Sequence, residues 1–331
     1  MCEMKHNSKA KKALIMVAIL ILVLVLLYSG LQILESTFFR QNEGTLHSGS
    51  DKTIVRDGVE YYPRQDITVM MVAGIDEDGP VTDSDSYNNS GEADMVSLLV
   101  FSEDKETVDI LCLNRDTMMD IPVLGLNGKP AGTIYGQLAL AHTYGSGLTD
   151  SSENLCNAVS KFLYNTYIDY YVTMNMDAIG ILNDAVGGVT VNVTEDFSAV
   201  DPSITMGEVK LSGKQAITYV RTRAGVGNQM NLTRMERHKT YMKSFMDVLV
   251  TKLDSDRRFV TNTYVDVTDY IVTDCSANSL AVILDRFSDY GLGDIVSIEG
   301  ENRKGDEFME YYVDEDALDE IILKYLYAPK K

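Results

Sequence analysis

The sequence predicts an α/β domain, built as a three-layer α-β-α sandwich and preceded by one N-terminal transmembrane helix. Strand-like and helix-like patterns alternate along most of the chain, which favours a sheet covered by helices on both faces. An unbroken apolar run lies near the N-terminus. Apolar residues make up 45% of the 331 residues, which is enough for a large core.

The apolar run predicts a membrane anchor. Ala13–Leu27 contains 15 consecutive apolar residues, and no charge follows until Glu35. A helix over residues 13–34 would be about 33 Å long, against a hydrocarbon core of about 30 Å. Four lysines precede the run: Lys5, Lys9, Lys11 and Lys12. The positive-inside rule then makes residues 1–12 a cytoplasmic tip and places the rest outside the cell membrane.

A cleaved signal peptide is the alternative, because 15 residues is also the upper end of a signal peptide's apolar region. No A-x-A-like cleavage site follows the run, which favours an uncleaved anchor. The net charge of −20 makes nucleic acid and anionic lipid surfaces poor partners for the chain as a whole. Cys112 and Cys156 lie in apolar periodic segments, which indicates buried thiols, although one disulfide among these two and Cys275 stays open.

The rest of the chain divides into a polar stalk at 35–64, a main domain at 65–254 and an α/β extension of that domain at 255–331. The segments predicted as strands are Ile67–Ala73, Met95–Phe101, Val108–Leu113, Tyr170–Met174, Val189–Val193, Tyr264–Val272 and Ile295–Ile298. The predicted helices are Asp150–Tyr164, Asp177–Val186, Ser212–Val220, Thr233–Leu253, Ser279–Tyr290 and Glu315–Tyr327. Ser212 with Gln215, and Thr233 with Glu236, have the spacing of capping boxes, and Asp150 is a candidate N-cap.

A basic window stands out in this acidic chain. Residues 210–243 hold eight lysines and arginines and one acid, Glu236. If Thr233 caps a helix, Arg234 and Arg237 lie in its first turn, where the helix dipole disfavours cations. An anion bound at that helix end would explain the arrangement. Arg221 and Arg223 follow the preceding helix, and four converging arginines indicate phosphate or pyrophosphate. A structural arginine network that answers the surplus acids is the alternative.

Acids that could complete such a site lie at strand ends, where α/β sheets bind ligands. Asp76 follows one predicted strand, Asp94 opens the next, and Arg115 and Asp116 follow the third. Hard oxygen ligands beside phosphates indicate Mg²⁺, although turn chemistry alone explains any single Asp. The sequence contains no known nucleophile motif. His142 is expected to be a structural residue. His238 follows Arg237 and could face the site, although a surface position is favoured.

Several segments together resemble the LytR-CpsA-Psr family. The segments are G-I-D (74–76), A-D-M-V-S-L-L (93–99), N-R-D-T-M (114–118), D-A-V-G-G-V-T-V-N-V (184–193), L-S-G-K-Q-A-I-T-Y-V-R-T-R (211–223) and R-M-E-R (234–237). They follow the family order and cover about residues 66–250. The resemblance implies a short cytoplasmic tip, one transmembrane helix and an extracytoplasmic α-β-α domain.

The resemblance also implies an activity, the Mg²⁺-dependent transfer of a glycopolymer from a polyprenyl-pyrophosphate carrier to a cell-wall hydroxyl, such as one of peptidoglycan, in Gram-positive bacteria. Asp76 and Asp94 would hold Mg²⁺ against the pyrophosphate, and the isoprenoid tail would enter an apolar tunnel under the sheet. The residues implied to bind phosphate oxygens are Arg115, Arg221, Arg223 and Arg237, with Arg234 near them. Asp116 would orient Arg115 or assist at the metal.

Three positions depart from the usual family pattern. Glu92 stands where many members carry Arg, Asn114 where many carry Pro, and Asn231 where an acid is common. Glu92 in place of Arg weakens the expected binding of phosphate. Asn231 in place of an acid leaves no residue assigned to activate the acceptor hydroxyl. Two alternatives to the transferase therefore stay open. One is a polyprenyl-pyrophosphate phosphatase, and the other is a non-catalytic protein that binds lipid pyrophosphate or has a regulatory role.

Overall fold

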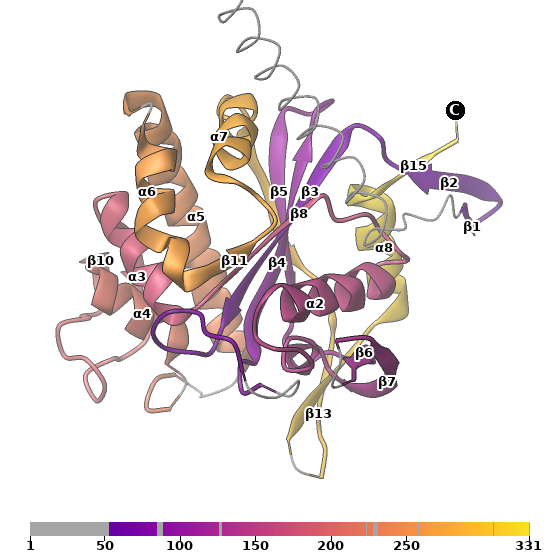
Figure 1. The fold of residues 1–331 in the computed structure, drawn as a ribbon, viewed down its shortest axis with the longest axis horizontal. Coiled ribbons are helices and arrows are strands. Elements are labelled where there is room, and N and C mark those ends of the chain that lie inside the picture. The colour runs from indigo at the N-terminus through magenta and orange to yellow at the C-terminus, as the bar shows by residue number, and fades with distance from the viewer. Residues whose placement is uncertain are drawn as a thin grey trace, which may run out of the picture. The chain divides into compact units, whose positions relative to one another are not determined.

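A six-stranded mixed sheet forms the middle of the domain in the computed structural model, which describes residues 53–84, 89–125, 128–222, 224–227, 231–256, 258–306 and 308–330 (Figure 1). In spatial order its strands are β11 (Ile271–Thr273), β8 (Tyr170–Met174), β3 (Ile67–Ile75), β4 (Ala93–Ser102), β5 (Thr107–Leu113) and β12 (Gly291–Ser297). β4 runs antiparallel to both β3 and β5. The C-terminal ends of β3 and β5 and the N-terminal end of β4 therefore meet at one edge.

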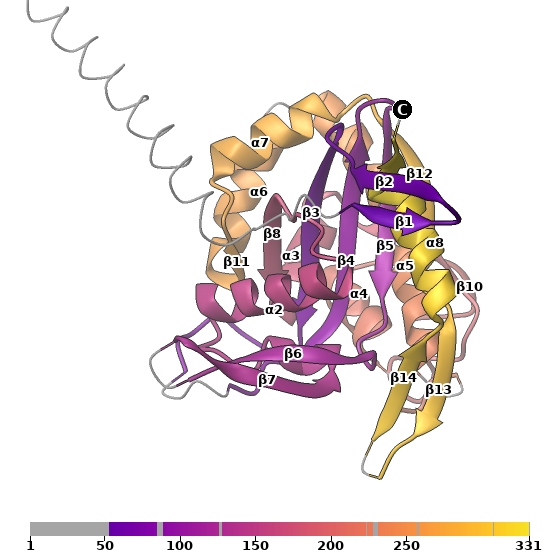
Figure 2. The same cartoon turned by 90° about the vertical axis from the view of Figure 1, so that its right-hand side faces the viewer.

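Helices cover both faces of this sheet, as the sequence predicted (Figure 2). On one face α2 (Thr149–Phe162) and α8 (Glu315–Tyr325) bury Leu155 and Ile322 in the same core as Met71. On the other face α7 (Ala277–Arg286) packs against the sheet, and Phe287, which follows it, stacks on Phe101 with ring centroids 4.5 Å apart. Successive residues of a strand point to opposite faces, so the continuous burial of β3 reflects both layers.

A second core lies beside this sheet. Its elements are α3 (Met176–Ala185), β9 (Val189–Val193), β10 (Gly207–Leu211), α4 (Gly213–Arg221), α5 (Asn231–Ser255) and α6 (Phe259–Val267). The capping box of Ser212 and Gln215 at the start of α4 is confirmed. A Cβ atom on Gly213 would lie 2.6 Å from both the Gly180 carbonyl oxygen and Asp184 Oδ2, so only glycine permits the close packing of α4 on α3.

Short elements complete the domain. They are β1 (Ile54–Arg56), β2 (Val59–Pro63), β6 (Met118–Leu124), β7 (Pro130–Gln137), β13 (Gly300–Lys304), β14 (Met309–Val313), β15 (Tyr327–Pro329) and the 3₁₀ helices η1 (Leu138–Ala141) and η2 (Thr268–Tyr270). β2 pairs with both β1 and β15, so residues that we assigned to the stalk form part of the folded domain. The region 255–331 contributes β11 and β12 to the central sheet.

Three local predictions were wrong. Tyr264–Val272 was expected to be a strand, but α6 continues to Val267 because Phe259, Thr263 and Val267, spaced by four, form its buried face. Thr233 does not cap α5, which already includes Asn231. Asp150 lies inside α2, and its carboxylate accepts hydrogen bonds from the Ser146 amide and hydroxyl instead.

The predicted anchor at 13–34 lies outside the described residues. Within those residues, no helix has the length and apolar character to cross a membrane. Cys112, Cys156 and Cys275 are buried free thiols, so the expectation of buried thiols is confirmed and no disulfide joins them.

Candidate functional site

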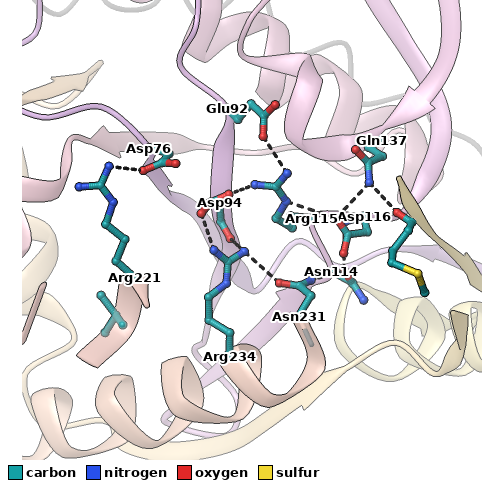
Figure 3. A network of polar contacts seen from close by, with 12 residues as sticks. Asp76, Glu92, Asp94, Asn114, Arg115, Asp116, Gln137, Arg221, Asn231 and Arg234 are labelled. Carbon is teal, nitrogen blue, oxygen red and sulfur yellow. Dashed lines mark hydrogen bonds and ion pairs between the residues drawn. The ribbon is translucent and has the colours of Figure 1, made fainter. Parts of the chain in front are cut away.

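Four of the predicted site residues meet at one edge of the central sheet (Figure 3). Asp76 directly follows β3, Asp94 is the second residue of β4, and Arg115 and Asp116 follow β5. The Asp76 amide donates a hydrogen bond to the Glu92 carbonyl oxygen at 2.9 Å, which holds the ends of β3 and β4 together. The antiparallel topology therefore gathers residues from three separate segments.

A β-bulge sets the direction of Asp94. Gly74 pairs with Met95 and Ile75 pairs with Ala93, so Asp94 has no partner residue on β3. A bulge bends the strand and re-aims the side chain of the extra residue. In Figure 3 the Asp94 carboxylate lies between Arg115 and Arg234.

Asp94 joins two arginines from different parts of the fold. Arg115 Nη1 pairs with its Oδ1 atom, and Arg234 Nη1 donates to its Oδ2 atom. The three residues are 7%, 8% and 1% exposed. A carboxylate this deeply buried is tolerated only with such partners. Since Arg234 belongs to α5 and Arg115 follows β5, the pairing also fixes α5 against the sheet edge.

Arg115 is surrounded by three acids. Besides Asp94 it contacts Glu92 Oε2 through Nη2 at 2.7 Å and Asp116 Oδ1 through Nε at 3.3 Å. Asp116 Oδ1 also accepts a hydrogen bond from Gln137 Nε2 at 3.0 Å. Asp116 therefore contacts Arg115, and its role at the site stays a prediction.

The three departures from the family pattern belong to one connected network. Glu92 binds Arg115, as described above. Asn231 Nδ2 donates to Asn114 Oδ1 at 2.7 Å, and Arg234 Nη2 donates to Asn231 Oδ1 at 2.9 Å. Asn231 thus orients Arg234 through a neutral amide, which cannot accept a proton as a carboxylate would.

Arg221 forms the more open side of the site. It is the last residue of α4, where the helix dipole favours a cation. Its Nη2 atom lies 2.8 Å from Asp76 Oδ1, and its Nη1 atom donates to Asp78 Oδ1 at 2.7 Å. Its side chain is 37% exposed, against 9% for Arg115 and 1% for Arg234. Of these three guanidiniums, Arg221 is the most accessible to an incoming anion.

Of the two remaining predicted arginines, only Arg237 lies among the described residues. Arg223 lies outside the described residues. Arg237 points to a separate group, with Nε 3.3 Å from Glu195 Oε2 and the guanidinium carbon 5.4 Å from the centre of the Phe197 ring. Burial lowers the pKa of Arg237, and the nearby Glu195 carboxylate partly opposes that effect.

Asp76 and Asp94 are the two carboxylates predicted to hold Mg²⁺. Among the residues that the structure describes, no three His, Cys, Asp or Glu side chains are grouped so that they could hold a metal ion. Mg²⁺ usually takes one or two carboxylates and completes its shell with substrate phosphates and water. Two acids on adjacent strand ends fit that chemistry, although each already contacts an arginine.

An apolar cavity of about 250 Å³ opens beside the network. It lies between the sheet strands β3, β4, β5 and β8 and the helices α3, α4 and α5. Its walls are almost entirely apolar, for example Val172, Ile179 and Phe245. Its polar lining includes Asp94, Arg221 and Arg234. The cavity therefore joins an apolar chamber to the charged cluster, where the resemblance implied a lipid tunnel.

His238 also lines this cavity, so its predicted surface position was wrong. It follows Arg234 by one helical turn and therefore shares its face of α5. The Val220 carbonyl oxygen lies 2.9 Å from its Nε2 atom. Burial, with a further contribution from Arg234, lowers the pKa of His238 from 6.5 to about 3. The imidazole is accordingly neutral at physiological pH.

Sequence reasoning missed Gln137 and Glu195, and it favoured the wrong position for His238. Gln137 and Glu195 carry no motif that would have distinguished them from ordinary polar residues. His238 had a usable signal, since residues 231, 234, 238, 241 and 245 repeat at the spacing of one helical face. His142, by contrast, is a buried residue whose Nδ1 atom lies 2.8 Å from the Gly91 carbonyl oxygen, as expected for a structural histidine.

The chain is similar to known proteins along most of its length. The model of the LytR_cpsA_psr family matches residues 39–325. The polyisoprenyl-teichoic acid–peptidoglycan teichoic acid transferase TagU of Oceanobacillus iheyensis is 27% identical over 252 residues, covering 74% of this chain and 72% of that protein. TagU of Bacillus subtilis is 28% identical over 223 residues, covering 66% of this chain and 65% of that protein, slightly less than two thirds of its length.

A solved structure, described as TagT bound to LIIa-WTA, has a TM-score of 0.61 and 19% sequence identity. The match covers 86% of this chain and 96% of that one. At this level of identity the likeness shows the fold.

The buried pairing of Asp94 predicts unequal effects of two arginine substitutions on stability. Arg234→Met leaves Asp94 Oδ2 and Asn231 Oδ1 without their buried donor, although Arg115 still pairs with Asp94 Oδ1, and it should lower the free energy of unfolding by about 3–5 kcal/mol. Arg221→Met removes a more exposed pairing and should cost about 1 kcal/mol or less. Urea unfolding followed by circular dichroism measures both. Equal losses would contradict the central position of Asp94.

The low pKa of His238 predicts a loss of stability in mild acid. The unfolded chain takes up a proton at His238 below its ordinary pKa of 6.5, whereas the folded protein does not until about pH 3. This residue alone should therefore cost the folded state up to about 2 kcal/mol between pH 6.5 and pH 5. Unfolding of wild type and of His238→Gln at both pH values measures it. If the difference in free energy of unfolding between the two proteins did not change with pH, the low pKa of His238 would be disproved.

Proposed function

Because the chain belongs to the LytR-CpsA-Psr family, whose relatives are named as transferases, we propose that it transfers a glycopolymer from a polyprenyl-pyrophosphate carrier to a cell-wall hydroxyl, such as one of peptidoglycan. The observation that carries the proposal is the junction of the apolar cavity with Asp94, Arg221 and Arg234. A polyprenyl pyrophosphate has the same division, an apolar tail joined to a strongly anionic head.

The charge balance of the site supports a requirement for Mg²⁺. Among the described residues, the ion pairs of the site involve three arginines (Arg115, Arg221 and Arg234) and five acids (Asp76, Asp78, Glu92, Asp94 and Asp116). Acids therefore outnumber arginines, and an anionic head group would be repelled unless further cations accompany it. Mg²⁺ held by Asp76 and Asp94 would neutralise the phosphate oxygens and fix their orientation.

The protein's own residues would act mainly by positioning and by charge stabilisation. Arg221, the most open of the three, would meet the phosphates first. Arg115 and Arg234 are held in fixed orientations by Asp94, Asp116 and Asn231, so they are preorganised for the charge that develops on the departing carrier phosphate. The amide of Asn231 cannot take the acceptor's proton, which leaves that task to a carboxylate or to water.

The proposal extends to location. The apolar segment at 13–34 would anchor the protein in the cell membrane with its N-terminus in the cytoplasm. The domain would then lie outside the cell, beside both the lipid carrier and the wall. The relatives' names, which include polyisoprenyl-teichoic acid and peptidoglycan, agree with that setting.

A phosphatase is the second candidate, because water could attack the same pyrophosphate in place of a sugar hydroxyl. The exposure of Arg221 and Asp76 favours it, since solvent reaches this side of the site. A protein that only binds the lipid is the third candidate, favoured by the three acids that already occupy Arg115. Product analysis with and without acceptor separates the first two, and the absence of any turnover would favour the third.

The proposal predicts metal-dependent turnover that requires Arg221. Full-length protein in detergent should release lipid phosphate from a polyprenyl-pyrophosphate-linked sugar with Mg²⁺ and stop with a chelator. Arg221→Ala should lower turnover by roughly a hundredfold or more, since it removes a charge-stabilising contact. The matched control is Arg286→Ala, which also removes an arginine at a helix end that is paired with an acid, Glu103.

Chromatography of the radiolabelled lipid products measures both variants. Loss of turnover in Arg286→Ala as well would indicate a general effect of removing arginine. If the folded wild type turned over no carrier, the proposed enzyme activity would be contradicted.

The cavity predicts selectivity for the length of the lipid. Val172→Phe would fill part of the chamber and should raise KM for a long-chain carrier by roughly tenfold, as expected from losing contact with one or two methylene groups. A carrier of one or two isoprene units should be used as before. Val282→Phe, at a position 60% exposed on α7, is the matched control. An equal effect of Val172→Phe on both lengths would show that the tail does not occupy this cavity.

A further inference from the structure

Two side chains of α5 hold the C-terminal end of α4. The Val220 carbonyl oxygen, near the end of that helix, lies 2.9 Å from His238 Nε2. Arg237 Nη2 donates to the Thr222 carbonyl oxygen. The last carbonyl groups of a helix have no partner within it, and histidine and arginine side chains can supply one. Arg221, the last residue of α4, therefore has a restrained carbonyl group on each side of it in the chain.

The contact from His238 acts close to the Arg221 side chain. A peptide bond is planar, so the Val220 carbonyl and the Arg221 amide belong to one rigid unit. The hydrogen bond to this carbonyl therefore restrains the backbone that carries Arg221. Because a carbonyl oxygen only accepts, the hydrogen must stand on His238 Nε2. The imidazole, whose pKa burial holds low, supplies this donor without adding a positive charge beside the arginines.

Helix α5 connects this contact to the edge of the sheet. Arg234 lies one turn before His238 on the same face of the helix, and its Nη1 atom donates to Asp94. The two α5 residues are about 6 Å apart along the helix axis. One helix thus binds the sheet edge through Arg234 and the end of α4 through His238. The distance between Arg221 and Arg234, which both line the apolar cavity, depends on these two contacts.

The other contacts of Arg221 are less suited to hold it when a ligand binds. Its guanidinium pairs with Asp76 and Asp78, whose side chains are 37% and 69% exposed. Exposed ion pairs contribute little to stability. Asp76 is also one of the two carboxylates proposed to hold Mg²⁺, a role that would withdraw it from Arg221. The contact from His238 involves neither acid, so an anion can replace both without disturbing it.

We propose that His238 is a positioning residue, which holds Arg221 at the distance from Arg234 that lets both arginines bind one anionic head group. The inference rests on the proposed transfer reaction and adds a residue that lies outside the motifs of the family resemblance, since the last of these ends at Arg237. Groups that are already in place lose less conformational freedom on binding. Removal of the hydrogen bond from His238 should therefore weaken the binding of pyrophosphate through Arg221.

Binding of a small pyrophosphate tests the role of His238. The probe is a pyrophosphate ester with one isoprene unit, titrated with Mg²⁺ into the full-length protein in detergent and followed by calorimetry. Its short tail limits the influence of changes in the cavity. His238→Leu removes the donor and should raise Kd about fivefold, as expected for one hydrogen bond. His238→Gln keeps an amide donor and should stay within about twofold of wild type.

The matched control is Tyr264→Phe. It also removes a side-chain hydrogen bond to a backbone carbonyl, that of Cys275 at 3.0 Å, and should leave Kd unchanged. A double-mutant cycle then separates positioning from a general structural effect. If His238 acts through Arg221, His238→Leu should change Kd by less than about twofold in an Arg221→Ala background.

The outcomes separate this inference from the proposed function. Equal losses from His238→Leu with and without Arg221→Ala, or no loss in His238→Leu alone, would overturn the inference. A His238→Gln variant as weak as His238→Leu would do the same, because the donor would then not be the property that matters. Absence of binding by the folded wild type would instead count against the proposed function.

A spectroscopic measurement tests the contact without any ligand. Nitrogen NMR of full-length protein with isotope-labelled histidine reports which ring nitrogen carries the proton, and the signal lost in His238→Gln identifies His238. The geometry requires the proton on Nε2. A proton on Nδ1 and none on Nε2 would overturn the inference whether or not the protein binds the carrier, because the imidazole could then not donate to Val220.

Discussion

The site depends on one buried carboxylate, Asp94, held between Arg115 and Arg234. A bulge in β4 turns this carboxylate toward the arginines, and its pairing fixes α5 to the edge of the sheet. Because a buried charge without partners is costly, the three residues stabilise one arrangement of strand, loop and helix. The position of α5 in turn determines the wall of the apolar cavity and the place of His238. The stability of the domain and the shape of the cavity therefore depend on the same contacts.

The departures from the family pattern are best understood together. Glu92 adds an acid beside Arg115, while Asn231 and Asn114 replace an acid and a proline with a pair of hydrogen-bonded amides. The first change adds negative charge at the sheet edge, and the second removes it beside Arg234. The network thus keeps its arginines oriented, although its charges are distributed differently from those of the usual family pattern. The surplus of acids that remains is consistent with a reaction in which a cation arrives with the anionic substrate.

The sequence was informative where local chemistry decides the structure. The Ser212 capping box and the convergence of Asp76, Asp94 and Arg115 on one edge follow from residue types and strand order. It was less informative where tertiary packing decides. The start of α5 at Asn231 brought His238 into the cavity, and Arg237 turned toward Glu195 and Phe197. Gln137 also donates to the Met309 carbonyl oxygen, in a hairpin 172 residues away in sequence, which no local pattern reveals.

The most direct test is the affinity for Mg²⁺ with and without the carrier. Since Asp76 and Asp94 both contact arginines in the ligand-free protein, Mg²⁺ and carrier should bind cooperatively. Calorimetric titration of the full-length protein without the carrier should detect no saturable Mg²⁺ binding. With polyprenyl pyrophosphate bound, the same Mg²⁺ concentrations should saturate the protein, after subtraction of Mg²⁺ binding to the lipid alone. Equally tight Mg²⁺ binding without the carrier, lost in Asp94→Asn, would contradict the account, because it would show that the arginines do not occupy the metal's ligands.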